Sequence, residues 1–210
     1  MRIRVTFAKK GPLRYIGQID LHKLWERAAR RADLPLLYSQ GFHPQPKLNL
    51  AAALPLGFSS RCEIVDMRLV DEIEFEGLIQ RLRDTLPTGI QILSIERVEE
   101  FAPALQTQIV SAEYEVVFTE PIEWAELDQN IQSMLATAEL PRERRGKTYD
   151  LRPLIEEVAL TENLPDAPPK LWMRLAAREG ATGRPDEVLS TLGILPETTR
   201  IERTRLIFQP

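Results

Sequence analysis

The chain has 210 residues, of which 43% are hydrophobic and 28% charged, and its formal net charge is −4. This composition is typical of a folded globular protein and excludes disorder over the whole chain. No stretch approaches the roughly 18 apolar residues of a membrane helix, and the first seven residues alternate polar and apolar, unlike a secretory signal. We therefore expect a cytoplasmic protein that does not span a membrane.

Cysteine and histidine are scarce. Cys62 is the single cysteine, and His22 and His43 are the two histidines. One cysteine excludes an internal disulfide framework, a multi-cysteine zinc site and three-cysteine ligation of an iron–sulfur cluster by this chain. We expect no metal site and no cofactor in it.

The first half of the chain predicts six main elements in the order β-α-β-β-α-β. Residues 2–8 alternate polar and apolar, which is typical of a half-buried strand with a basic outer face. Residues 35–39 fit a further short strand, and two prolines and a glycine prevent regular structure in the loop 41–47. The main elements are strand 2–8, helix 19–33, strand 48–52, strand 62–69, helix 74–86 and strand 90–98.

The second half repeats this order after a connector at residues 100–108. Its predicted elements are strand 113–119, helix 123–136, strand 154–160, strand 171–175, helix 184–192 and strand 200–208. The repeat predicts an α+β fold of tandem ferredoxin-like (split βαβ) units, with antiparallel sheets and helices packed on one face. We expect an N-terminal unit with a basic surface at residues 1–100 and a C-terminal unit at residues 109–210.

Charge is unevenly distributed along the chain. Residues 1–61 contain 11 Lys and Arg against three Asp and Glu, a formal charge of +8, and the rest of the chain carries −12. This asymmetry favours a surface for nucleic acid or another polyanion near the N-terminus. The alternative is a solvated helix face that only keeps the protein soluble.

Several strings occur in order along the chain: Arg14-Tyr15-Ile16-Gly17, Gly41-Phe42-His43-Pro44-Gln45-Pro46-Lys47, Ala53-Leu54-Pro55-Leu56-Gly57 and Asp150-Leu151-Arg152-Pro153-Leu154-Ile155. Together they resemble the radical-SAM-linked protein family, a bacterial domain of unknown function found beside, or fused to, B12-binding radical-SAM proteins. The resemblance implies a radical-SAM B12-binding protein as partner, which holds the iron–sulfur cluster, SAM and cobalamin. The tandem layout also looks like that of endoribonucleases that process guide RNA, but this likeness transfers no residue.

Three segments supply candidates for RNA binding. The loop 41–47 offers Phe42 for stacking on a base and Lys47 for a phosphate, unless Phe42 instead anchors the loop in the core. The predicted helix 19–33 carries a stripe of cations, and the segment 142–147 fits a phosphate-binding hairpin or a solvated hairpin tip. The candidate nucleic-acid-binding residues are Arg14, Lys23, Arg27, Arg30 (or its neighbour Arg31), Phe42, His43, Lys47, Arg142, Arg144, Arg145 and Lys147.

Candidate catalytic residues are few. A metal-independent RNA cleavage needs a base, an acid and cations near the phosphate, and His22, His43 and Tyr15 with Lys47 include these types. Structural alternatives are that Asp20 caps the helix and His22 lies on its solvent face.

We therefore expect an accessory protein of a B12-binding radical-SAM enzyme that binds RNA or another polyanionic substrate and is not catalytic on its own. The alternatives are a metal-independent endoribonuclease and a pure protein-interaction adaptor.

Overall fold

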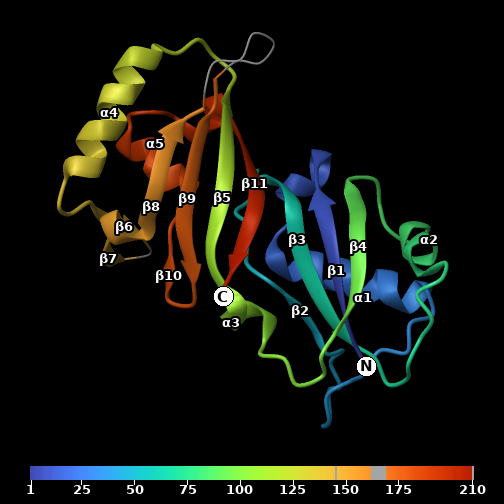
Figure 1. Ribbon diagram of the computed structural model, residues 1–210. Helices are drawn as coiled ribbons and strands as arrows, with labels where there is room; N and C mark the ends of the chain where they lie inside the picture. Colours follow the sequence, from blue (N-terminus) through green and yellow to red (C-terminus); the bar gives the residue numbers. More distant parts are fainter. Residues whose placement is uncertain (145, 162–168, 210) are drawn as a thin grey trace. The chain divides into compact units, whose positions relative to one another are not determined.

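The computed structural model describes residues 1–144, 146–161 and 169–209 (Figure 1). It divides the chain into two compact units, Met1–Gln108 and Ile109–Pro210. Five α-helices and mostly antiparallel strands make up the described residues, which confirms the predicted α+β class. No helix in the described part of the chain has both the length and the apolar character to cross a membrane.

The first unit contains an antiparallel sheet with the strand order β4-β1-β3-β2. The chain enters this sheet at a central strand, crosses over a helix to β2 and β3, and returns over a second helix to β4. The elements are β1 (Arg2–Lys9), a 3-10 turn (Gly11–Tyr15), α1 (Gln18–Arg31), β2 (Leu48–Leu50), β3 (Ser59–Arg68), α2 (Leu78–Arg83), β4 (Ile90–Val98) and α3 (Leu105–Gln108).

Both main helices of the first unit pack on the same face of the sheet. The alternation of β1 places Ile3, Val5 and Phe7 on that face, fully buried in one cluster with residues of α1 and α2. Trp25 of α1 packs edge-on against Phe7, with ring centroids 4.7 Å apart. Because Trp25 is completely buried, it fixes α1 on the sheet and leaves the opposite side of the helix to solvent.

The other face of β1 is charged, but the expected exposed basic surface is wrong for its first residues. Arg2 is only 4% exposed and donates to Asp66 Oδ2 at 2.6 Å, while Arg4 Nε donates to Asp66 Oδ1 at 2.8 Å. The antiparallel register sets Asp66 of β3 directly opposite Arg4. Arg2 also donates to the carbonyls of Ala102 and Pro103. These two arginines therefore hold the sheet and the following connector together.

The second unit repeats the strand arrangement of the first. Its sheet has the order β11-β5-β9-β8, all antiparallel, and the central strand is again the first in sequence. A β-hairpin, β6–β7, is inserted after the first helix, and β10 pairs with the end of β9. The elements are β5 (Ile109–Phe118), α4 (Trp124–Ala136), β6 (Pro141–Arg144), β7 (Lys147–Asp150), β8 (Ile155–Leu160), β9 (Leu171–Arg178), β10 (Ala181–Thr182), α5 (Pro185–Thr191) and β11 (Thr199–Phe208), with 3-10 turns at Arg152–Leu154 and Pro196–Thr198.

Several predicted bounds shift by up to four residues, and three predicted segments differ more from the structure. The helix expected at 74–86 is shorter, because Gly77 adopts a left-handed conformation with φ of 69° and α2 begins only after it. Residues 35–39 form no strand but two isolated bridges, Leu36 with Leu69 and Tyr38 with Pro46. The connector contains the short helix α3, which buries Leu105.

Candidate nucleic-acid interface

A groove of about 490 Å³ runs along α1 in the first unit. One wall is the solvent side of α1, and the other is the turn that follows α2, at residues 85–87. Thr85 ties the two walls together, because its hydroxyl donates to Ala28 O at 3.2 Å and to Leu82 O at 2.8 Å. Leu24, Ala28, Leu86 and Pro87 give the groove apolar surface.

Three cations of α1 line this groove: Lys23, Arg27 and Arg31. They recur every four residues, so they follow one another along the helix at steps of about 6 Å. All three side chains are exposed, and within the described residues none of them makes an ion pair or a side-chain hydrogen bond. The groove is thus a row of uncompensated positive charges beside an apolar wall.

Arg30 stands outside the groove. Its guanidinium pairs with Glu26 one turn earlier, at 3.3 Å, and 60% of its side chain is exposed. Of the two neighbouring arginines at the end of the predicted stripe, the structure places Arg31 in the groove.

The position of the turn after α2 depends on the absence of a side chain at Gly89. Gly89 has φ of 107°, and a Cβ atom there would lie 2.7 Å from the carbonyl oxygen of Lys10. The same approach lets Lys10 N donate to Gly89 O at 2.8 Å. A side chain at this position would push the turn away from the residues that precede α1.

At the start of α1, one end of the groove is lined by an apolar and an acidic residue instead of cations. Ile16 and Asp20 line that end. The adjoining Tyr15 is 60% exposed, and the Arg14 guanidinium lies 4.8 Å from its ring centroid and donates to its hydroxyl at 2.8 Å. Asp20 makes no capping hydrogen bond, because Gly17 occupies the N-cap position and Asp20 lies inside the helix. The predicted residues Arg14 and Tyr15 precede Ile16 in the chain and do not line the groove.

The loop 41–47 contributes no residue to the groove. Two hydrogen bonds between Ser39 and Gln45 join the two ends of this loop. The Ser39 hydroxyl accepts from Gln45 N at 2.9 Å, and Ser39 N donates to Gln45 O at 2.8 Å. Phe42 is fully exposed, so the alternative that it anchors the loop in the core is wrong. His43 and Lys47 are exposed as well.

The candidate catalytic residues contact different parts of the first unit and no hydrogen bond joins them in the described structure. His22 is half-buried, and its Nε2 lies 3.0 Å from Leu48 O, so the ring joins α1 to β2 and does not lie on the solvent face. His43 stands on the exposed loop, and the Tyr15 hydroxyl accepts from Arg14. The described residues contain no group of three or more His, Cys, Asp or Glu that would hold a metal ion.

The basic hairpin β6–β7 belongs to the second unit. Arg142 is held against α5 by Thr191, to which it donates, and by Glu187 at 3.9 Å. Arg144 and Lys147 are exposed, whereas Arg145 lies outside the described residues. Burial raises the pKa of Tyr149 in β7, and the charge of Glu187 raises it further, against the opposing effect of Arg144.

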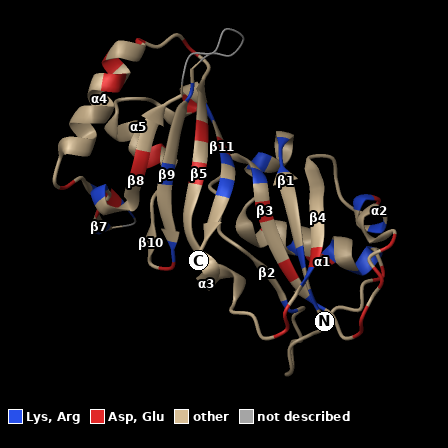
Figure 2. Ribbon diagram, viewed as in Figure 1, with Lys and Arg blue, Asp and Glu red and all other residues tan. Residues whose placement is uncertain are grey.

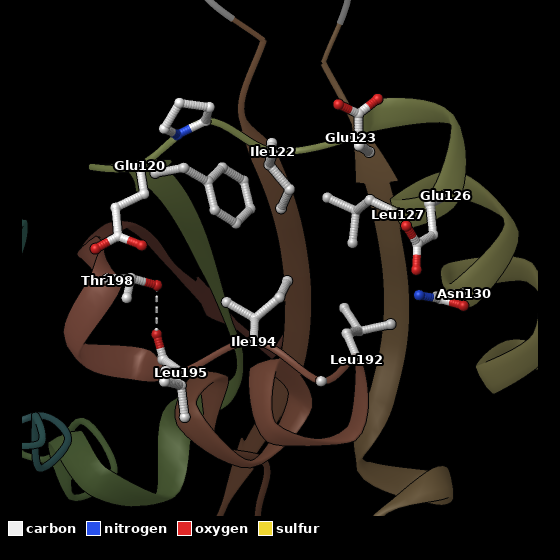
Figure 3. Close-up of a pocket in the computed structure, with 13 residues that line it drawn as sticks. Glu120, Ile122, Glu123, Glu126, Leu127, Asn130, Leu192, Ile194, Leu195 and Thr198 are labelled. Carbon is white, nitrogen blue, oxygen red and sulfur yellow. Dashed lines mark hydrogen bonds between the residues drawn. The ribbon is translucent and has the colours of Figure 1, made fainter.

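The second unit has a pocket at the place that corresponds to the groove. It lies between the start of α4 and the turn after α5, with a volume of about 350 Å³. Figure 3 shows Ile122, Leu127, Leu192 and Ile194 directed into this pocket. The carboxylates around it belong to Glu120, Glu123 and Glu126, which pair with no cation among the described residues. Figure 2 shows the same contrast, with acidic segments on α4 and basic segments on α1.

The sequence did not lead us to predict this acidic pocket or the second wall of the groove. One sequence feature indicates where both lie. In each half of the chain, the second helix ends in a turn with Pro or Gly, at 87–89 and at 193–196. In a unit where both helices cover one face, that turn comes to lie beside the first helix. The pattern predicts the location, but not that the two sites differ in charge.

The fold and the groove define an α+β protein of two similar units, one with a cationic groove. The chain belongs to the bacterial family described as "Uncharacterized protein conserved in bacteria (DUF2344)", whose model matches residues 2–185. A comparison with curated proteins finds no match. The groove lies entirely within the matched residues, whereas the turn at 192–195 beside the acidic pocket lies beyond them.

Proposed function

We propose that this chain is a non-catalytic accessory protein that binds RNA through the groove along α1. The observation that carries the proposal is the row of Lys23, Arg27 and Arg31, three exposed cations on one side of a helix without partners among the described residues. Such a row attracts a chain of phosphates, because binding a polyanion releases its condensed counterions. The apolar wall beside the row offers contacts to sugars and bases.

We further propose that each unit is ferredoxin-like. The support is that both units have the element order β-α-β-β-α-β and place their strands in the order fourth-first-third-second. An inserted hairpin after the first helix distinguishes the second unit. A duplicated scaffold of this kind gives two equivalent grooves that can diverge in charge.

The proposed partner is a B12-binding radical-SAM enzyme, which would supply the iron–sulfur cluster, SAM and cobalamin. This proposal rests on the resemblance carried by strings such as Gly41–Lys47 and Ala53–Gly57. The exposure of Phe42 is consistent with a loop that meets another molecule.

The second candidate function is that of an adaptor that docks a protein partner at the acidic pocket of α4. The pocket combines an apolar interior with three carboxylates, which suits a basic segment of a partner and repels RNA. An endoribonuclease has less support, because His22 is engaged by the backbone of β2.

Charge reversal tests the RNA-binding proposal. We expect Arg27→Glu with Arg31→Glu to abolish binding of the full chain to RNA at near-physiological salt. The matched control is Arg178→Glu with Arg200→Glu, two exposed arginines of the second unit with the same total charge change. Equal loss in both variants would show that only net charge matters and would contradict a site on α1.

Co-purification of this chain with the radical-SAM protein tests whether the two proteins associate. If the partner docks at the acidic pocket, as the second candidate function has it, the triple variant Glu120→Lys, Glu123→Lys, Glu126→Lys loses the partner and keeps RNA binding. The control variant Glu139→Lys, Glu143→Lys, Glu179→Lys changes exposed carboxylates of the same unit outside the pocket. No association between the two wild-type proteins would refute the partner.

A further inference from the structure

The groove along α1 has two ends of opposite character. Arg27 and Arg31 lie at the end nearer the C-terminus of the helix, and Asp20 lies at the other, about 16 Å from Arg31 along the axis. A uniform phosphate-binding groove has no use for a carboxylate, which repels phosphate. The end at Asp20 therefore suits a different chemical group of a ligand from the cationic end.

The Asp20 carboxylate offers two hydrogen-bond acceptors that no described residue engages. Its carboxylate is exposed, and the described residues give it neither an ion pair nor a hydrogen bond, even with Lys23 one turn away. In RNA the donors that fit a carboxylate are the ribose 2′-hydroxyls and the amino and imino groups of the bases. Guanine presents two such groups side by side, which match the two carboxylate oxygens, whereas uracil presents one donor between two acceptors.

Three apolar side chains near the start of α1 are exposed. Tyr15, Ile19 and Leu56 are exposed by 60%, 72% and 61% respectively. Gly57 N donates to Arg14 O at 2.8 Å, and the Tyr15 ring lies 3.8 Å from the position that a Cβ atom of Gly57 would occupy. The turn at Leu56-Gly57 thus lies beside the Tyr15 ring, which also contacts the Arg14 guanidinium. The exposed part of this ring can stack with a base.

We propose that the groove binds single-stranded RNA, with a guanine held by Asp20 and stacked at Tyr15, and with the adjoining phosphates on Lys23, Arg27 and Arg31. This rests on the proposed function. Base pairing occupies the edge of guanine that Asp20 would bind, and duplex stacking covers the ring face that Tyr15 would bind. A duplex therefore satisfies only the cationic end of the groove.

The test measures binding of the full chain to labelled oligonucleotides by fluorescence anisotropy. The probes are an eight-nucleotide oligouridine, the same strand with one central guanosine, and a duplex that contains the guanosine strand. For the wild-type protein we expect about tenfold tighter binding of the guanosine strand than of either other probe, as a bidentate base contact provides.

Asp20→Asn should remove the preference for guanosine and leave the salt dependence of binding unchanged. Asp33→Asn is the matched control, because Asp33 is exposed just beyond α1 and is not part of the groove. Tyr15→Ala should weaken binding of every single strand, and Tyr15→Phe should restore it. An unchanged unfolding midpoint in these variants separates recognition from a structural role.

The outcomes distinguish the two proposals. Failure of the wild-type protein to bind any probe at near-physiological salt would overturn both. Equal binding of duplex and single strand, or a guanosine preference that survives Asp20→Asn, would overturn the inference and leave RNA binding by the groove intact.

Discussion

Asp66 shows how one buried carboxylate supports the first unit. It is 2% exposed and accepts hydrogen bonds from both Arg2 and Arg4, and Arg2 in turn holds the carbonyls of the connector. Removing one member of such a group leaves uncompensated charge in the interior. This lowers the stability of the fold by more than the intact ion pairs contribute to it.

We predict that Asp66→Asn lowers the free energy of unfolding by about 3 kcal/mol or more, because the guanidinium groups of Arg2 and Arg4 lose the negative charge of Asp66. Urea unfolding followed by circular dichroism measures this. Asp71→Asn, at an exposed position of the same unit, is the control and should have little effect. Equal stability of the two variants would show that Arg2 and Arg4 find other partners.

Burial and the charge of Glu187 disfavour the anion of Tyr149 and raise the pKa of its hydroxyl above that of an ordinary tyrosine. The difference in tyrosinate absorbance between the wild-type protein and Tyr149→Phe should therefore show a pKa above the usual value. Arg144→Ala should raise this pKa further, since Arg144 lowers it. Because the folded chain keeps this proton longer than the unfolded chain, stability should fall as the pH rises through the pKa of the folded state. A difference titration at the ordinary tyrosine pKa would contradict this environment.

At the scale of elements, helix α1 carries the cations of the proposed RNA-binding site. Its apolar period places Leu21 and Trp25 inside and so leaves the stripe of cations outside, as the sequence predicts. Spacing alone does not separate Arg30 from Arg31, because both lie within reach of one stripe. The separation comes from Glu26, which engages Arg30, and from the turn at 85–87, which forms a wall beside Arg31.

This difference predicts unequal effects of two adjacent substitutions. Arg31→Ala should weaken RNA binding several-fold through a lost phosphate contact, whereas Arg30→Ala should leave it nearly unchanged. Both variants remove one charge from the last turn of the same helix, so each controls for the other. Equal losses in an anisotropy titration would place the RNA on the outer face of α1.

The order and type of most elements follow from the sequence, because strands and helices bury their apolar residues with different periods. Other features depend on contacts between distant residues. The short α2 is set by the conformation of Gly77, and the burial of Arg2 by Asp66 on another strand. The two walls of the groove come from residues more than 50 positions apart in the sequence. Only the cationic wall on α1 could therefore be predicted from local spacing.

At the scale of the whole molecule, the two units share one scaffold and differ in charge. The first unit has 15 Lys and Arg against 13 Asp and Glu, and the second 12 against 18. The first unit is thus only weakly basic as a whole, and its basic character is concentrated in residues 1–61. Under the proposed function, this distribution directs RNA to the groove of the first unit and away from the acidic pocket of the second.

The salt dependence of RNA binding tests the central claim most directly. With three phosphate contacts to a single strand, the logarithm of the association constant should fall against the logarithm of salt concentration with a slope of about −2. Arg27→Ala with Arg31→Ala should reduce this slope to about −0.7, whereas Arg178→Ala with Arg200→Ala should leave it unchanged. A slope near zero for the wild-type protein, or the same slope in both double variants, would contradict binding of phosphates along α1.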